Sequence, residues 1–144
     1  MKRLDKKGRV SVPSSFRDVL SRGNFRGIVG FRSFKFAAIE CFSMERMETL
    51  SQDLESLDLF SQDQDHFASS IFADAEQLGF DTEGRIALPT LWKEHTGCME
   101  EIAFVGRGST FQIWNPQGFA EHQAQARETL RQQQGSLKRP VDKN

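Results

Sequence analysis

The sequence predicts an α+β fold in which one small β-rich unit occurs twice. The segment DKKGRVSVP at residues 5–13 returns as DTEGRIALP at residues 81–89, and both follow the pattern D-x-x-G-R-φ-x-φ-P, where φ is aliphatic. A helix-like segment follows each copy, and two β-like runs follow each helix. A repeat whose flanks also agree indicates that a whole supersecondary unit was duplicated.

In the first unit, a strand leads into a turn that contains Gly8 and Arg9, and a second strand leaves it. Pro13 then opens the segment SSFRDVL, and proline at the first helical position favours a helix start. Phe16, Val19 and Leu20 fall on one face of that helix. The runs GIVGFR and FKFAAIE after it predict a hairpin.

The middle of the chain predicts two helices. Ser43 fits an N-cap, and Glu45 lies in the favourable first turn. An apolar stripe at helical spacing follows: Met44, Met47, Leu50, Leu54 and Leu57. Such a stripe is far more typical of packing than of a cofactor site. After a polar, acidic connection at residues 61–65, a shorter helical pattern runs through Phe67, Ile71, Phe72 and Ala75.

The second unit repeats the order of the first. Pro89 opens TLWKEHTG, in which Trp92 has the offset of Phe16, and EIAFVG with TFQIW predicts a hairpin. Asn115 and Pro116 suit the N-cap and first position of a final helix rich in Gln and Ala. We therefore divide the chain into a first repeat with its helix (1–60), a second repeat with the C-terminal helix (61–134) and a flexible basic tail (135–144).

Composition indicates a soluble globular protein of ordinary size. The chain has 144 residues, 38% of them hydrophobic, and a mean hydropathy of -0.53. No apolar run approaches the roughly 20 residues that span a bilayer, and no signal peptide follows the basic N-terminus, so we expect a cytoplasmic protein. Cys41 and Cys98 stand alone, which favours buried reduced thiols. No metal site and no cofactor are expected.

Charge is distributed unevenly along the chain although the net charge is only -1. Residues 1–35 hold ten basic residues against Asp5 and Asp18, which is about +8 by count. Residues 40–83 hold twelve acidic residues, opposed by Arg46 alone. A polarised molecule follows, and its basic first third could attract a polyanion.

The repeated turn has both structural and functional interpretations. Turn geometry accounts for the following residues: Asp5, Gly8, Pro13, Asp81, Gly84 and Pro89. It explains Arg9 and Arg85 less well, because a polar turn tolerates many residues there. An Asp–Arg ion pair within the turn is one explanation, and recognition of a ligand is the other. The two roles are compatible.

A guanidinium can hold a phosphate or grip the O6 and N7 atoms of guanine, so these arginines are candidate DNA contacts. The first turn is surrounded by further candidate phosphate contacts: Lys2, Arg3, Lys6 and Lys7. In the second turn Thr82 and Glu83 replace the two lysines. We therefore expect Arg85 to have less support from neighbouring positive charges in binding DNA. It could instead help to set the register of the complex or to fold the turn.

The doubled motif, the FRDVL and LWKEHTG helices and the segment FVGRGSTFQIW resemble the MraZ family, within the AbrB-like swapped-hairpin superfamily. The resemblance covers about residues 1–130. It implies a pseudo-twofold, double swapped-hairpin β-barrel with flanking helices, ring-like homo-oligomers and nucleoid association. It also implies transcription regulation through repeated promoter boxes upstream of the division and cell-wall gene cluster, including the protein's own promoter. Arg9 and Arg85 carry over as DNA-contacting, with Lys6 and Lys7 as neighbours.

One departure from the family concerns the start of the chain. Family members usually carry several residues before the first motif, whereas this chain reaches Asp5 almost at once. We therefore expect a short first strand.

Two other classes of function compete with a DNA-binding regulator. An enzyme is not favoured, because His66, His95 and His122 lie outside any nucleophile elbow, metal-ligand spacing or phosphate-binding loop. A ring-forming scaffold that binds protein through the Met- and Leu-rich helix, and never binds DNA, remains the alternative.

Overall fold

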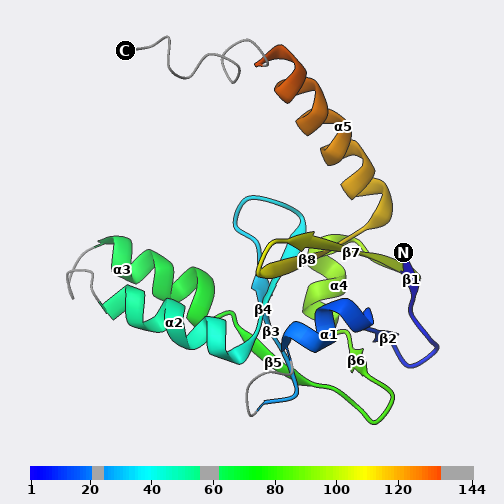
Figure 1. The fold of residues 1–144 in the computed structure, drawn as a ribbon, viewed down its shortest axis with the longest axis horizontal. Coiled ribbons are helices and arrows are strands. Elements are labelled where there is room, and N and C mark those ends of the chain that lie inside the picture. Colours follow the sequence, from blue (N-terminus) through cyan, green and yellow to red (C-terminus); the bar gives the residue numbers. More distant parts are fainter. Residues whose placement is uncertain (21–24, 56–61, 134–144) are drawn as a thin grey trace.

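The structure is a computed structural model that describes residues 1–20, 25–55 and 62–133 (Figure 1). It has the α+β character expected from the sequence. The first half contains β1 (Lys2–Arg3), β2 (Arg9–Ser11), α1 (Ser14–Leu20), β3 (Gly27–Arg32) and β4 (Ala38–Phe42). The same order follows later in β5 (Glu76–Gly79), β6 (Arg85–Ala87), α4 (Thr90–Thr96), β7 (Glu101–Arg107) and β8 (Thr110–Trp114).

Within the described residues, three helical segments lie between these two series of elements, and one follows them. They are α2 (Met44–Glu55), α3 (Gln62–Phe67), the π-helical η1 (Ala68–Phe72) and α5 (Pro116–Gln132). Ser43 caps α2, because its Oγ accepts a 3.0 Å hydrogen bond from the Arg46 amide. Asn115 caps α5 through the amides of Gln117 and Gly118. The predicted basic tail at 135–144 and Leu57 lie outside the described residues.

The main sheet is antiparallel and curls into a half-barrel, with the strand order β1-β7-β8-β4-β3-β5. Its edge strands come from the opposite series of elements, since β1 pairs with β7 and β5 pairs with β3. The two hairpins meet in the middle through β4 and β8. β1 is only two residues long, which agrees with the short first strand expected from the sequence.

A separate two-stranded ribbon joins β2 to β6, with Val10 opposite Ile86. Side chains alternate across a strand, so Val10 and Ile86 point into the core. The outer face therefore carries the four remaining side chains: Arg9, Ser11, Arg85 and Ala87. This alternation places both motif arginines on one surface.

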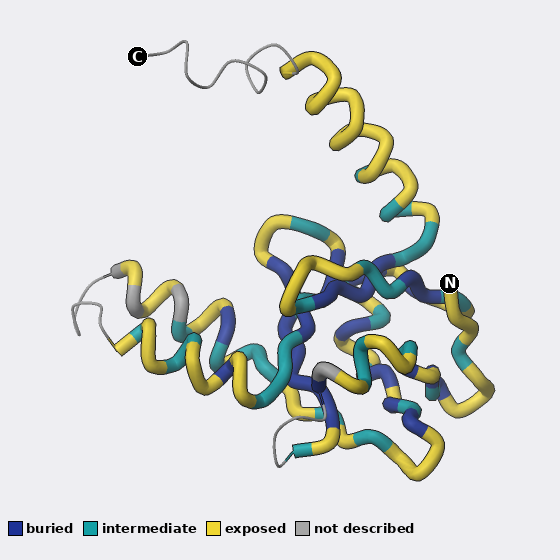
Figure 2. Tube along the Cα trace, in the orientation of Figure 1, coloured by how far each residue is buried: buried dark blue, intermediate teal, exposed yellow. Residues whose placement is uncertain are grey.

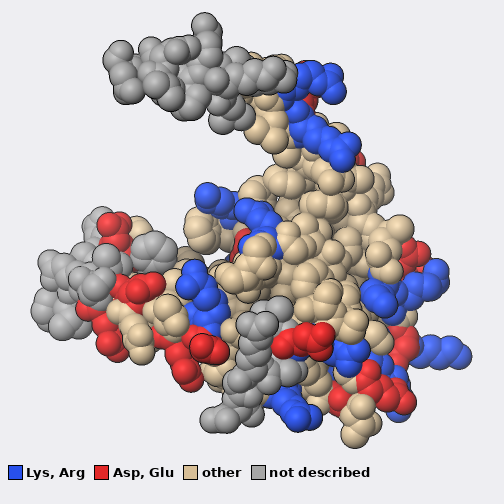
Figure 3. All heavy atoms as spheres, in the orientation of Figure 1, with Lys and Arg blue, Asp and Glu red and all other residues tan. Residues whose placement is uncertain are grey.

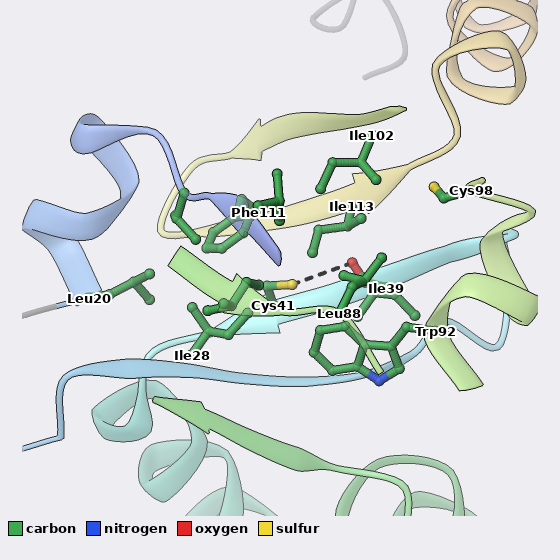
Figure 4. Packing of buried hydrophobic residues seen from close by; sticks show 13 residues of the cluster. Leu20, Ile28, Ile39, Cys41, Leu88, Trp92, Cys98, Ile102, Phe111 and Ile113 are labelled. Carbon is green, nitrogen blue, oxygen red and sulfur yellow. Dashed lines mark hydrogen bonds between the residues drawn. The ribbon is translucent and has the colours of Figure 1, made fainter. Parts of the chain in front are cut away.

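The core fills the space between the curled sheet, the ribbon and helices α1 and α4 (Figure 4). Trp92 of α4 is fully buried there, and its ring lies against Gly30 of β3. A Cβ at Gly30 would lie 2.5 Å from the Trp92 ring, so only glycine admits this close approach. Cys41 and Cys98 are buried and free, and burial raises the pKa of the Cys41 thiol well above its ordinary value.

The outer face of the main sheet is covered in two places. Val29 and Phe31 of β3 pack with Met47 of α2 and Ile71 of η1. At the other end Trp114 of β8 meets Phe119 at the start of α5, with ring centroids 5.6 Å apart. The rest of α5 projects from the body and is almost wholly exposed (Figures 1 and 2).

Three details of the sequence interpretation were wrong. The second strand of the first hairpin spans Ala38–Phe42 rather than the predicted run at residues 34–40. Residues 62–65 belong to α3 rather than to a connection. Asp63 and Asp65 lie in the first turn of this helix, where carboxylates stabilise the partial positive charge of a helix N-terminus. Pro89 is the N-cap of α4, because its extended ψ of 147° keeps it outside the helix.

Candidate nucleic-acid interface

The two Gly-Arg turns have the same hydrogen-bond scheme. In the first turn, Asp5 Oδ1 accepts hydrogen bonds from the amides of Lys7 (2.9 Å) and Arg9 (2.8 Å). In the second turn, Asp81 Oδ1 accepts them from Glu83 (2.9 Å) and Arg85 (2.9 Å). These bonds and a glycine at positive φ in each turn keep the loop closed between its flanking strands.

The same aspartates orient the arginines. Nε of Arg9 donates to Asp5 Oδ2 at 2.8 Å, and Nε of Arg85 donates to Asp81 Oδ2 at 2.8 Å. The hydrogen bond from the Arg9 amide is the largest influence that lowers the pKa of Asp5, and the Arg85 amide acts in the same way on Asp81. Both carboxylates therefore stay charged at neutral pH. The arginine side chains are partly exposed, at 34% for Arg9 and 26% for Arg85.

The surroundings of the two arginines differ. Within the described residues, the two terminal guanidinium nitrogens of Arg9 have no acceptor, and Lys6 and Lys7 beside it are exposed and form no ion pair. Nη2 of Arg85 instead lies 2.9 Å from Glu83, and its Nη1 lies 3.7 Å from Asp5. The first turn is therefore open and cationic, whereas the second is largely neutralised.

Two cations that the sequence interpretation did not assign to the site lie against the glycines. A Cβ on Gly8 would be 2.7 Å from Nζ of Lys93, and one on Gly84 would be 2.5 Å from Nη1 of Arg17. Lys93 belongs to α4 and Arg17 to α1, so each turn is backed by the helix of the other series. The available signal was the alignment of FRD with WKE after the two motifs, which puts a cation at the same offset in both helices.

The candidates Lys2 and Arg3 lie elsewhere. Both belong to β1 at the edge of the main sheet, and Nη1 of Arg3 donates to Glu101 at 3.3 Å. The charge of Arg3 is thus compensated by β7 rather than presented on the ribbon. Lys2 is exposed and could extend the basic surface.

The surface charge is polarised, as the sequence suggested. Carboxylates dominate the described surface over α2 and α3, whereas the opposite side, near the N-terminus and the first turn, carries Lys and Arg side chains interspersed with carboxylates (Figure 3). A polyanion would meet repulsion at the first region, whereas the second region offers the exposed lysines Lys6 and Lys7 of the first turn.

Two of the histidines make contacts with other parts of the described structure. His95 Nε2 lies 3.0 Å from the carbonyl of Phe36, and His122 stacks on Trp114 at a centroid distance of 4.8 Å. Among the described residues, no group of three or more His, Cys, Asp or Glu side chains is arranged to hold a metal ion. None of the helices in that part of the chain has the length and apolar character needed to cross a membrane.

Comparison with known proteins decides the family. Residues 71–139 match the family model described as "MraZ protein, putative antitoxin-like". The chain is 41% identical to the transcriptional regulator MraZ of Rickettsia bellii over 135 residues, which cover 94% of this chain and 90% of that protein. The chain belongs to the MraZ family. A second MraZ transcriptional regulator, from Pelagibacter ubique, is 43% identical over 136 residues, covering 94% and 88% of the two chains.

Membership in the MraZ family confirms the resemblance seen in the sequence. Relatives that match most of this chain are named transcriptional regulators, which supports transcription regulation as the broad function. In this MraZ-family chain, the ribbon face, the two arginine turns and the helix cations behind them are the candidate site.

Proposed function

We propose that this chain regulates transcription by binding duplex DNA with the outer face of the β2–β6 ribbon. The observation that carries the proposal is the open guanidinium of Arg9, which Asp5 orients while its terminal nitrogens stay available. A guanidinium presented in this way can hold two acceptors of one guanine or one phosphate. Arg9 is thus assigned to direct contact.

The shape of the ribbon suits a DNA groove. A two-stranded antiparallel ribbon fits the major groove, which is about 12 Å wide. Between the arginines the outer face carries only the small side chains of Ser11 and Ala87, so nothing bulky blocks a close approach. Lys6, Lys7 and Lys93 surround this face and are proposed to contact phosphates, which makes binding salt-dependent.

The exchange of edge strands supports a finer assignment of the fold. β1 joins the hairpin of the second series and β5 joins that of the first. We infer that the two series are copies of one unit, interleaved about a pseudo-twofold axis as a double swapped-hairpin AbrB-like barrel. The family further suggests a ring-like homo-oligomer that binds repeated boxes in its own promoter, upstream of the division and cell-wall genes. The site of action would be the cytoplasm, at the nucleoid.

Arginine substitutions test this proposal. Arg9→Ala should weaken binding to a duplex from the chain's own upstream region by about 1 to 3 kcal/mol for each interaction with a base that it removes, and it should relax sequence preference. Arg85→Ala should have a smaller effect, because carboxylates already occupy that guanidinium. Fluorescence anisotropy with the specific and a scrambled duplex measures both the affinity and the sequence preference of each variant.

Arg131→Ala is a matched control, since it removes an exposed cation of α5 that is paired with Glu128. It should leave DNA affinity close to the wild-type value. Unchanged binding after Arg9→Ala and Arg85→Ala together would contradict the proposal. Retention of oligomers without any DNA retardation would favour a protein-binding scaffold.

A further inference from the structure

The second turn holds its arginine much more tightly than the first. Arg9 is held by one carboxylate, through Nε alone. All three guanidinium nitrogens of Arg85 have an acidic neighbour: Nε lies 2.8 Å from Asp81, Nη2 lies 2.9 Å from Glu83, and Nη1 lies 3.7 Å from Asp5. The contact with Glu83 has no counterpart in the first turn, where Lys7 occupies the equivalent position.

We propose that Glu83 is a positioning residue that holds Arg85 within the second turn and thereby limits how strongly this turn engages DNA. This inference rests on the proposed DNA-binding function and deepens it. It assigns unequal roles to two turns that share one hydrogen-bond scheme. The first turn would provide most of the affinity, and the second would be restrained.

The charges support this division. Residues 5–9 contain Lys6, Lys7 and Arg9 against one aspartate, whereas residues 81–85 contain Arg85 against two carboxylates. For Arg85 to bind a phosphate, its Nη2 must leave Glu83, and the freed carboxylate would then face the same phosphate. Arg9 would neither lose an ion pair nor expose a carboxylate to the phosphate, because its terminal nitrogens have no acidic partner among the described residues.

A strong turn beside a restrained turn also gives each subunit a direction on the duplex. Two equal turns would bind equally well in either orientation, whereas unequal turns favour one. Subunits with a preferred direction suit boxes repeated in the same orientation. Glu83 is 66% exposed, so its role does not depend on packing.

Glu83→Gln tests the inference, because it keeps the shape of the side chain and removes the charge. The full chain is titrated with a duplex from its own upstream region over a range of salt concentrations. Affinity at low salt should rise about two- to fivefold, in the range of an exposed ion pair. The dependence of log affinity on log salt should steepen by about 0.9, the value for one additional phosphate contact.

Two further variants sharpen the test. Glu128→Gln removes an equally charged, exposed carboxylate from a pair with Arg131 (3.5 Å) on α5, and it should change neither affinity nor salt slope. The double variant Glu83→Gln/Arg85→Ala should bind DNA no more tightly than Arg85→Ala alone, because Glu83 acts through Arg85. Circular dichroism would verify that each variant has the wild-type fold.

The outcomes separate the two proposals. Wild-type and Glu83→Gln chains that bind DNA with equal affinity and equal salt slopes would overturn the role of Glu83 alone. A gain that persists without Arg85 would also overturn it, because Glu83 would then act by simple repulsion. Failure of the wild-type chain to bind any duplex at low salt would overturn the proposed function and this inference together.

Discussion

At the scale of single residues, one aspartate performs two tasks in each turn. Asp5 Oδ1 accepts the turn amides, while Oδ2 accepts Nε of Arg9. The carboxylate that closes the loop therefore also sets the direction of the guanidinium. The structural role of the motif and its proposed recognition role involve the same side chains, so neither interpretation of the Asp–Arg pair excludes the other.

The glycines of the turns provide a test at this scale. Gly84 has a φ of +74°, and a Cβ there would lie 2.5 Å from Nη1 and 3.0 Å from Cδ of Arg17. Gly108 has a φ of +75°, but a Cβ there would have no other atom within 4 Å, so it is a matched control. Gly108→Ala should cost about 1 kcal/mol of unfolding free energy from backbone strain alone. Gly84→Ala should cost about 2 to 3 kcal/mol, because Arg17 must also move.

Urea denaturation of both variants measures this difference. Equal decreases in unfolding free energy would show that Arg17 gives way without cost and does not brace the second turn.

At the scale of elements, an ion pair joins the main sheet to the segment that enters the second series. Asp74, between η1 and β5, accepts hydrogen bonds from the amide of Arg32 (2.7 Å) and from its Nη2 (2.7 Å). The bonded Arg32 guanidinium holds the pKa of Asp74 below its ordinary value. This contact fixes where β5 begins beside the end of β3.

The lowered pKa predicts how stability depends on pH. The contribution of Asp74 to the free energy of unfolding is fully present above the ordinary carboxyl pKa of 3.8. It is lost as the pH falls through the lower pKa that Asp74 has in the folded chain. Asp74→Asn should therefore destabilise the chain at pH 7 and have a smaller effect in strong acid. Thermal unfolding of both chains across this range checks the sign. If the wild-type and Asp74→Asn chains differed in stability by the same amount at every pH, the stabilisation by Asp74 would not be ionic.

α5 is an element whose two ends have different surroundings. Its first two turns are anchored where Trp114 meets Phe119 and His122, at centroid distances of 5.6 Å and 4.8 Å. Beyond His122 the helix is exposed on all sides within the described residues (Figure 2).

At the scale of the whole molecule, an acidic surface over α2 and α3 lies apart from the turns, where cations and carboxylates are interspersed (Figure 3). The net charge of -1 conceals this separation. The proposed DNA-binding face is thus kept away from the acidic surface of the molecule. Such orientation is useful when several subunits of a proposed ring must each align with one box.

Multivalent binding gives a prediction at this scale. If the chain forms a ring, a duplex with several correctly spaced boxes should bind about 100-fold more tightly than a duplex with one box, because linked contacts raise the effective concentration. Altered spacing should abolish most of that gain, since neighbouring subunits could no longer bind together. Anisotropy titrations with single, repeated and respaced boxes, together with light scattering for oligomer size, test this. Equal affinities for all three duplexes would exclude avidity.

Much of the fold could be predicted because its signals are local. The β-like runs GIVGFR and TFQIW, the capping residues Ser43 and Asn115, and the glycine turns each depend on neighbours in the chain. The start of α3 at Gln62 was missed because its polar, acidic composition looks like a loop. Within the candidate site, Arg9 and Arg85 could be proposed from the repeated motif alone.

By itself, the sequence determined the elements, their repeated order and the unequal charges of the two turns, because these depend on residue type and local spacing. Only the tertiary structure decided that β1 and β5 exchange sides and that Lys93 lies over Gly8. Strand partners and helix docking are set by burial of a shared core between segments far apart in the chain. Local patterns do not encode that choice, so the composite basic surface became visible only in three dimensions.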